Sequence, residues 1–405
     1  MRPMPGAGRI SPKTTCSTAW KRCSAMSSRL PGRLSILRRY LLTAPFLRRR
    51  QKPEAVRRLL VLHHLLLGDT LMLTPLLARL RERYPGAAIT MTVAPAFAPL
   101  YAAAPYGATV LPFDPRNPAT VDALLDSGPY DIAYLPGDNR YGLLAQAMGA
   151  RWVVAFAGDP AGWKNAWCDE LLPFPGQTTN VGDLFALLAG DEAWPGRFDP
   201  AQWPLPVAEL PDDLPDDAIA MLHLGAGNAM RLWPPHQWRA LAEALTEKGL
   251  RVVWSAGRGE EALVRAADPE GRYPSVAARL SLPTLAALLA KARLLVCLDS
   301  GICHLAKHTG TPTVVLYGPG NPDLFGRGDF WSAAPMTEVF QPDFPCRNEH
   351  VLFKRNAPWI VRCGRTVHTC EQVRQDDDRP ASACMSEITL AQVVAGVERV
   401  LAKKA

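Results

Sequence analysis

The feature that most constrains the fold is a repeated alternation between short apolar runs and segments with helical spacing. In the first half the apolar runs are RLLVLHHLLL, AAITMTV, ATVLPF, DIAYL and WVVAF, and helical patterns such as TPLLARLRERY and YGLLAQAMG lie between them. The second half repeats this order with AIAMLHL, LRVVWS, LLVCL and TVVLY. Strands that alternate with helices predict a parallel, doubly wound sheet. We therefore predict an α/β protein with two Rossmann-like domains that face a cleft.

A proline- and acid-rich segment, WPLPVAELPDDLPDDA, separates the two halves and has no hydrophobic periodicity, so we interpret it as a linker. Ligands of doubly wound folds bind beyond the carboxyl ends of the strands, so the cleft between two such domains is the expected site. The predicted divisions are a basic arm over 1–57, a first domain over 58–203, a linker over 204–218, a second domain over 219–340 and a cysteine-containing loop with a final helix over 341–405.

The basic residues are concentrated at the start of the chain. The net charge is +7, but residues 1–58 hold 15 Lys/Arg and a single acid, so the remainder is mildly acidic. Within this arm, LSILRRYLLTAPFLRRR offsets leucines from arginines, and an amphipathic basic helix is attracted to anionic lipid. We predict contact between residues 1–58 and an anionic membrane surface. A solvated extension, or a true start at Met26, is the alternative.

The cellular compartment is predicted from three further features. No apolar run reaches the ~18 residues that a transmembrane helix needs, and MRPMPGAGRISPKTTC lacks the apolar centre of a secretory signal. The nine cysteines are scattered without tight pairs, which is typical of a reducing compartment. We predict a cytoplasmic protein that is peripheral on the inner face of the membrane.

Polar loops follow the predicted strands in both halves. Gly68 and Asp69 come after LLL, where the carboxylate can face the cleft or cap a helix. In HLGAGNAMRLWPP, Gly225 lets the backbone approach a ligand and Arg231 suits a diphosphate, although a surface arginine is the alternative. In SAGRGEE, Glu260 is placed to bind the hydroxyls of a ribose or the amines of a base, or to be solvated.

A fourth loop, Asp299-Ser300-Gly301, opens a helical segment. We expect Ser300 to cap this helix and the amides of Gly301 and Ile302 to point at an anion in the cleft. His304 lies one turn later, near enough to donate to the same anion, although a lone histidine is more often structural. A fifth loop, YGPGNP, ends close to the same point. The second half is therefore predicted to hold a negatively charged ligand that bears a sugar.

Several classes of protein are disfavoured. The chain contains no GxxxxGK[ST] and no G-x-S-x-G, which argues against a P-loop NTPase and an α/β-hydrolase. The acid clusters PDDLPDD and QDDDRP do not follow apolar strands, so we predict neither a carboxylate-bound metal nor a required cofactor. We expect no nucleic acid as a partner.

With these residues in place, the sequence resembles glycosyltransferase family 9, the heptosyltransferases of lipopolysaccharide core assembly. The segments that carry the resemblance are LLLGDTLMLTPLLARLRERYPGAAITMTVAP, LGAGNAMRLWPPHQWRALAEAL and CLDSGICHLAKHTGTPTVVLYGPGNPDLFG. The resemblance implies a GT-B fold, an ADP-heptose type of donor in the second half and an acceptor, such as lipopolysaccharide core, in the first.

The resemblance also implies roles for individual residues. Asp69 matches the catalytic base, and Arg231 stands where the family usually has a lysine for the donor phosphate. Glu260 resembles an acid that contacts the nucleotide. The remaining donor-site positions are Gly225, Asp299, Ser300, Gly301 and His304.

This chain departs from the family pattern before the GD turn, and its basic arm is longer than the resemblance requires. His63-His64-Leu65-Leu66 replaces an arginine and a further glycine before the GD turn, so we place His63, His64 and Gly68 on an altered acceptor side. The tail carries cysteines without a C-x₂-C pair, so they are a secondary candidate for a structural metal or a redox centre, and free thiols are the alternative. These cysteines are Cys346, Cys363, Cys370 and Cys384.

The resulting hypothesis is an inverting glycosyltransferase in which Asp69 accepts the proton of the attacking acceptor hydroxyl. Arg231 and the amides after Ser300 would stabilise the leaving diphosphate. Two rivals remain open, namely a nucleotide-sugar epimerase of GT-B fold and a non-catalytic protein that binds nucleotide sugars.

Overall fold

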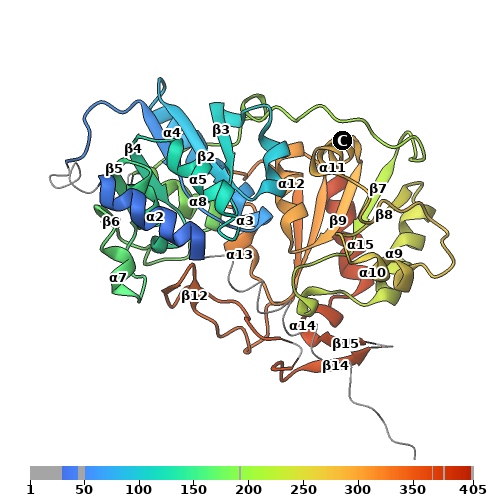
Figure 1. The fold of residues 1–405 in the computed structure, drawn as a ribbon. Coiled ribbons are helices and arrows are strands. Elements are labelled where there is room, and N and C mark those ends of the chain that lie inside the picture. Colours follow the sequence, from blue (N-terminus) through green and yellow to red (C-terminus); the bar gives the residue numbers. More distant parts are fainter. Residues whose placement is uncertain (1–29, 44–50, 191–192, 367, 377–378, 403–405) are drawn as a thin grey trace, which may run out of the picture.

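The computed structural model describes residues 30–43, 51–190, 193–366, 368–376 and 379–402, and its elements are labelled in Figure 1. The first 29 residues of the predicted arm lie outside the described part. The helix α2 (Leu30–Thr43) falls within it. None of the helices described in the structure combines the length and the apolar character needed to cross a membrane.

The first half contains a six-stranded sheet in which every neighbouring pair is parallel. Its strand order is β3-β2-β1-β4-β5-β6, so the direction of winding reverses between β1 and β4. The strands are β1 (Arg58–Val61), β2 (Ala88–Val93), β3 (Ala108–Pro112), β4 (Tyr130–Leu135), β5 (Ala150–Phe156) and β6 (Glu170–Leu172).

The second half contains a five-stranded sheet, again parallel throughout. Its order is β11-β10-β9-β7-β8, and the winding reverses between β7 and β9. The strands are β7 (Ile219–His223), β8 (Arg251–Ser255), β9 (Leu294–Leu298), β10 (Thr313–Tyr317) and β11 (Met336–Phe340). The predicted α/β class with parallel sheets is therefore confirmed.

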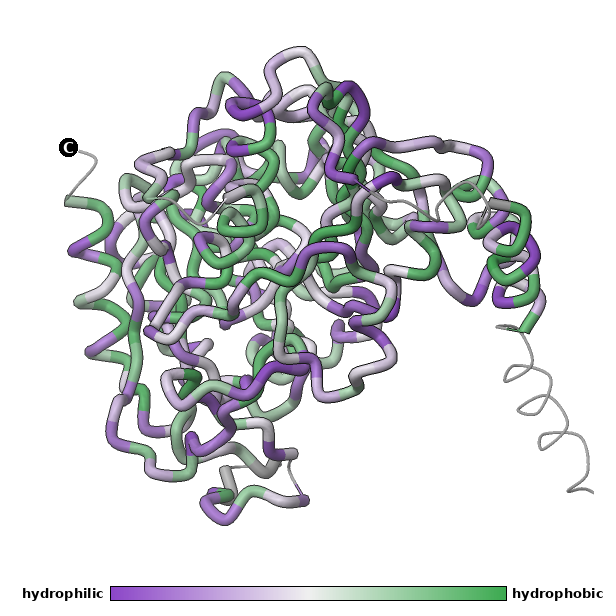
Figure 2. Tube along the Cα trace, turned by 90° about the vertical axis from the view of Figure 1, so that its left-hand side faces the viewer, coloured by the Kyte–Doolittle hydropathy of each residue, from purple (hydrophilic) through white to green (hydrophobic). Residues whose placement is uncertain are grey.

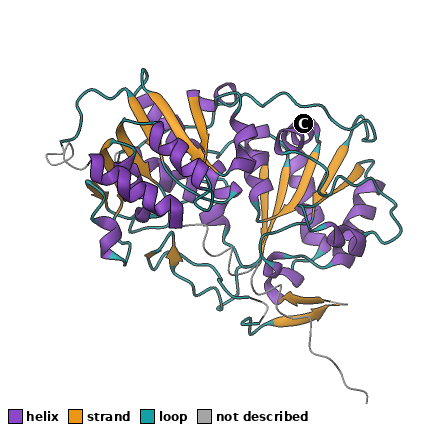
Figure 3. Cartoon of the chain, viewed as in Figure 1, coloured by secondary structure: helices purple, strands orange, loops and turns teal. Residues whose placement is uncertain are grey.

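Helices flank both sheets, as Figure 3 shows. Those of the first half are α3 (Leu67–Leu71), α4 (Thr74–Arg83), α5 (Pro118–Asp126), α6 (Gly142–Ala147), α7 (Gly162–Asn165) and α8 (Val181–Ala186). Those of the second half are α9 (Pro235–Glu247), α10 (Glu261–Ala267), α11 (Leu282–Lys291), α12 (Gly301–Thr309), α13 (Pro322–Phe325), α14 (Ala383–Ser386) and α15 (Leu390–Ala402). Their apolar stripes face the sheets because burial of apolar surface is the main force that holds these layers together.

The two halves share one packed core, which contains buried residues of both sheets and of α4, α8 and α12. At their boundary Thr74 Oγ1 lies 2.8 Å from His308 Nε2, and the Trp203 ring is centred 4.2 Å from the His308 ring. Thr74 is the first residue of α4, and its hydroxyl donates to the carbonyl of Leu71. The halves are therefore fixed against each other along this boundary.

The tail crosses from the second half back to the first. It forms two short hairpins, β12 (Val351–Leu352) with β13 (Arg355–Asn356) and β14 (Val373–Asp376) with β15 (Arg379–Ser382). Figure 1 shows β12 beneath the first half. There Arg355, which is 1% exposed, donates to the carbonyls of Phe156 and Ala157 and to Asn139 Oδ1 at 2.6 to 3.2 Å. The tail therefore fastens the two halves together.

Candidate active site

A cleft of about 730 Å³ lies at the carboxyl ends of strands from both sheets. Gly68 and Asp69 follow β1, and Gly225 follows β7. Because the winding of the second sheet reverses between β7 and β9, this is where a doubly wound fold is expected to bind its ligand. The predicted residues that line the cleft are Gly68, Asp69, Gly225, Arg231, Glu260, Asp299, Ser300, Gly301 and His304.

Two glycines bring the halves into contact inside the cleft. A β-carbon at Gly68 would lie 2.8 Å from His304 Cδ2, and one at Gly301 would lie 3.1 Å from Leu67 Cδ2. The start of α3 and the start of α12 can approach this closely only because neither position carries a side chain. This contact sets Asp69 of the first half beside the loop that precedes α12 in the second.

Asp69 lies within the short helix α3, and Leu66 occupies the N-cap position, so the capping alternative for Asp69 does not apply. Burial raises the pKa of the Asp69 carboxyl to about 6; Arg231 opposes this rise, Asp299 adds to it and Arg362 opposes it. Among the described residues, no donor makes a hydrogen bond to this carboxylate. It is therefore placed to accept a proton from a bound molecule.

Asp299 follows β9 directly and is almost fully buried. Arg231 Nη1 donates to the Asp299 backbone carbonyl at 2.7 Å and lies 3.4 Å from Asp299 Oδ2. Burial raises the pKa of the Asp299 carboxyl, while Arg231, Lys307 and Arg362 oppose that rise. Arg231 is thereby held at the floor of the cleft, with its side chain about a third exposed.

Ser300 is the residue before α12. We predicted that its side chain would cap this helix, but the side chain makes no capping hydrogen bond. Within the described part of the chain, Ser300 Oγ and His304 Nδ1 are buried and lack a hydrogen-bond partner. The amides of Gly301 and Ile302 are the first of the helix, so they have no acceptor within it. Burial lowers the pKa of His304 well below its usual value, which favours the neutral imidazole.

Glu260 sits at the other end of the cleft, before α10. Its Oε2 accepts a hydrogen bond from the Gly257 amide at 2.8 Å. A β-carbon at Gly225 would lie 1.9 Å from the same oxygen, so glycine at 225 is what allows the carboxylate to reach this position. The Glu260 carboxylate is thus fixed beside the loop that follows β7.

His63 and His64 do not line this cleft. The backbone of His63 pairs with the hydroxyl of Thr92, and burial lowers the pKa of its imidazole to about 3. The ring of His64 packs edge-on against Phe113 at 5.8 Å. Both histidines lie where the apolar pattern continues β1, so the structure does not bring them into the cleft with Gly68.

The tail contributes lining residues that the sequence did not indicate. Glu349 and Arg362 form an ion pair of 3.2 Å, and each side chain is about 30% exposed. Phe353 and Lys354 adopt positive φ values of 45° and 70° in the turn between β12 and β13. This segment has no hydrophobic periodicity, so nothing in the sequence predicts that it reaches the cleft. Its lining residues are Glu349, Val351, Leu352, Phe353, Lys354 and Arg362.

The four tail cysteines are free thiols, as are all the cysteines in the described part. In that part, three metal-ligating atoms come within 4.8 Å of one another at Asp299, Cys303 and His304, and not at the tail cysteines. Cys303 Sγ donates to the Ser300 carbonyl at 2.9 Å, and Asp299 already pairs with Arg231.

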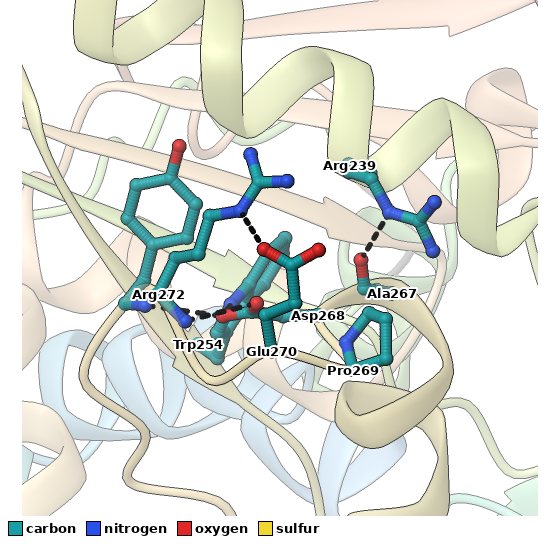
Figure 4. Close-up of a pocket in the computed structure, with 8 residues that line it drawn as sticks. Arg239, Trp254, Ala267, Asp268, Pro269, Glu270 and Arg272 are labelled. Atoms are coloured by element: carbon teal, nitrogen blue, oxygen red, sulfur yellow. Dashed lines mark hydrogen bonds and ion pairs between the residues drawn. The ribbon is translucent and has the colours of Figure 1, made fainter.

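A second, much smaller cavity of about 30 Å³ lies beside α9 and is drawn in Figure 4. Asp268 accepts hydrogen bonds there from Trp254 Nε1 and from the amides of Arg272 and Tyr273. Arg239 donates to the carbonyl of Ala267. Because these polar groups satisfy one another, we assign this cavity a structural role.

The fold is shared with solved glycosyltransferases. The E. coli ADP-heptose lipopolysaccharide heptosyltransferase II aligns with a TM-score of 0.63 and 18% identity, covering 86% of this chain and 99% of that one. The E. coli heptosyltransferase WaaC with ADP aligns with a TM-score of 0.56 and 19% identity, covering 70% of this chain and 92% of that one. The predicted GT-B architecture is therefore confirmed.

Sequence comparison defines the family. The profile of glycosyltransferase family 9 (heptosyltransferase) matches residues 129–354, which is more than half of the chain. The chain belongs to this family. Lipopolysaccharide heptosyltransferase 1 of Pseudomonas aeruginosa PAO1 is 39% identical over 132 residues, which cover 32% of this chain and 35% of that relative. The match thus spans about a third of the relative's length.

Proposed function

We propose that this protein is an inverting glycosyltransferase that moves a heptose from ADP-heptose onto a glycan acceptor of the lipopolysaccharide core. One observation carries the proposal. An acid of the first half, Asp69, and an arginine of the second half, Arg231, line the same cleft within electrostatic reach of each other. Family membership and a WaaC structure with ADP-2-deoxy-2-fluoro heptose support the choice of donor.

The donor diphosphate binds between Arg231 and the first amides of α12. Negative charge grows on the diphosphate as the glycosidic bond breaks, and fixed donors aimed at that charge stabilise the transition state. Arg231 suits this task because its position is held by Asp299, at 2.7 Å from the carbonyl. Glu260 binds the ribose hydroxyls at the opposite end, and the unpaired Ser300 hydroxyl and neutral His304 bind the sugar.

Asp69 is the general base. Its carboxylate takes the proton from the acceptor hydroxyl as that oxygen attacks the anomeric carbon on the face opposite the diphosphate, which inverts the configuration. A base is most effective when its pKa is close to the working pH, and burial moves the pKa of Asp69 toward neutrality, to about 6. Arg231 and the helix amides supply the positive potential for the leaving group, so the proposed reaction needs no metal.

Incubation with donor, with and without acceptor, tests this proposal. We expect stereochemically inverted product with a core-type acceptor and only slow hydrolysis with ADP-heptose alone. Conversion of the donor to another sugar nucleotide would identify an epimerase. Tight donor binding without transfer to any acceptor would identify a binding protein. We further propose that the reaction takes place on the cytoplasmic side of the membrane, where the nucleotide sugar is available.

A further inference from the structure

Helix α2 presents two different faces. Figure 2, which colours the Cα trace by hydropathy, shows hydrophobic and hydrophilic residues interspersed along the chain. One face packs on the first half. Gly32 abuts Val121 of α5, where a β-carbon would lie 3.2 Å from Val121 Cγ2, and Ile36 packs against the core beneath α5 and α6. The Tyr40 ring meets Trp167 edge-on at 5.2 Å. These contacts fix the rotation of the helix about its own axis.

The opposite face carries a stripe of exposed leucines. Their spacing of four, three and four residues keeps them on one side of an α-helix. The four members of this leucine stripe and their exposed fractions are Leu30 (61%), Leu34 (58%), Leu37 (48%) and Leu41 (63%). The neighbouring Leu42 is 62% exposed. Large apolar side chains gathered this way on a water-facing helix mark an interaction surface.

Arginines flank the leucine stripe on both sides. At 100° per residue, Arg33 falls on one edge of the stripe and Arg38 on the other. Both are exposed, and neither forms an ion pair within the part of the chain that the structure describes. Arg39 lies nearer the docked face and contacts Asp126 and the carbonyl of Leu125. The exposed face is thus apolar along its centre and positively charged at its edges.

We propose that the leucine stripe of α2 docks on an anionic lipid bilayer, with Arg33 and Arg38 at the level of the headgroups. A basic helix with an apolar face lies in the plane of a membrane interface because burial of the leucines and attraction of the cations act together. The charge of the surrounding segment fits this partner, since residues 1–58 carry 15 Lys/Arg and one acid. This inference does not depend on the proposed reaction.

Sedimentation of the full chain with vesicles tests the docking surface. We expect binding to phosphatidylcholine vesicles that contain phosphatidylglycerol, weaker binding as salt is raised, and none to phosphatidylcholine alone. The double substitution Leu34→Asp and Leu41→Asp should weaken binding at least about tenfold, and Arg33→Glu with Arg38→Glu should do the same. The matched controls, Gln202→Asp with Val207→Asp and Arg265→Glu with Lys291→Glu, change exposed positions elsewhere by the same charge and should bind like the parent.

Three results would overturn the proposal. The first is a parent protein that does not bind the anionic vesicles, or a leucine variant that binds as tightly as its control. The second is a leucine variant whose molar mass in solution falls below that of the parent, because the stripe would then be covered by a second copy. The third is a leucine variant that melts at a clearly lower temperature than its control, because the stripe would then be covered by another part of the same chain.

Discussion

Gly68 of the first half lies so close to His304 of the second half that a methyl group at position 68 would have to displace the imidazole ring, 2.8 Å from its Cδ2 atom. The catalytic geometry that we propose depends on this contact, because Asp69 is the next residue. A protein that binds acceptor and donor in different halves needs such a contact to hold its reacting groups in register.

Substitution of Gly68 by alanine should therefore separate α3 from α12 and reduce transfer. We expect kcat to fall by about 10–100-fold with a smaller change in donor affinity, since a displacement of about 1 Å at the reacting atoms costs up to ~10²-fold. Steady-state kinetics and donor titrations on the same preparation measure both effects. Gly86→Ala is the matched control because a β-carbon there meets no atom within 4 Å. Equal loss in both variants would contradict this interpretation.

The activity should depend on pH through Asp69. The pKa of its carboxyl is raised to about 6, so the carboxylate that accepts the proton predominates above pH 6 and is lost as the pH falls below it. We expect kcat/KM to decrease below about pH 6. Asp69→Asn should lower kcat by about 10²–10⁴-fold while donor binding persists. Asp122→Asn, at an exposed site on α5, is the control. Turnover of Asp69→Asn at the parent rate would refute the assignment of the base.

Arg362, which lies in the tail, should affect the acid limb of the pH profile, that is, the pH range in which kcat/KM falls as Asp69 becomes protonated. Its guanidinium lowers the pKa of Asp69, so Arg362→Gln should move the limb to higher pH, whereas Arg362→Lys should keep it near its original place. The pH profile of kcat/KM measures the shift. Arg265→Gln removes a charge from the far surface of α10 and should leave the limb unchanged. A profile of Arg362→Gln that superimposes on that of the parent would show that the tail does not act on Asp69.

Arg355 should contribute strongly to stability. Its guanidinium is buried and bonded to acceptors of the first half, so Arg355→Ala leaves the carbonyls of Gly137 and Ala157 and Asn139 Oδ1 without this donor. Each orphaned group costs about 1–3 kcal/mol, and we expect the free energy of unfolding in urea to fall by about 3–5 kcal/mol. An alanine at the exposed Arg265 should change it by less than about 0.5 kcal/mol. Similar unfolding midpoints for the two variants would contradict the role given to Arg355.

The alternation of strands and helices could be predicted because parallel strands buried on both faces appear as continuous apolar runs, as in LLVCL and TVVLY. The residues after those runs could be predicted to converge for the same reason, since a doubly wound sheet gathers its strand ends at one edge. Asp299 and Glu260 were found this way, and both line the cleft. The resemblance to a family added the specific role of Asp69.

Three features could not be predicted, each for a physical reason. His63 and His64 stand next to the GD turn in sequence, but the register of β1 turns the first into the core and the second toward Phe113. Lys354 and Arg362 reach the cleft through an irregular tail that has no period to follow. Ser300 precedes α12 as expected, but the orientation of its hydroxyl depends on tertiary packing rather than on its position in the sequence.

The bridge made by Arg355 also has a consequence for synthesis. The carbonyls of Gly137 and Ala157 leave the ribosome about two hundred residues before the guanidinium that binds them. The first half can form its sheet during translation, but that edge stays without its donor until the tail has emerged. A nascent chain arrested before residue 355 would thus expose polar backbone that becomes concealed only once the tail has been synthesised.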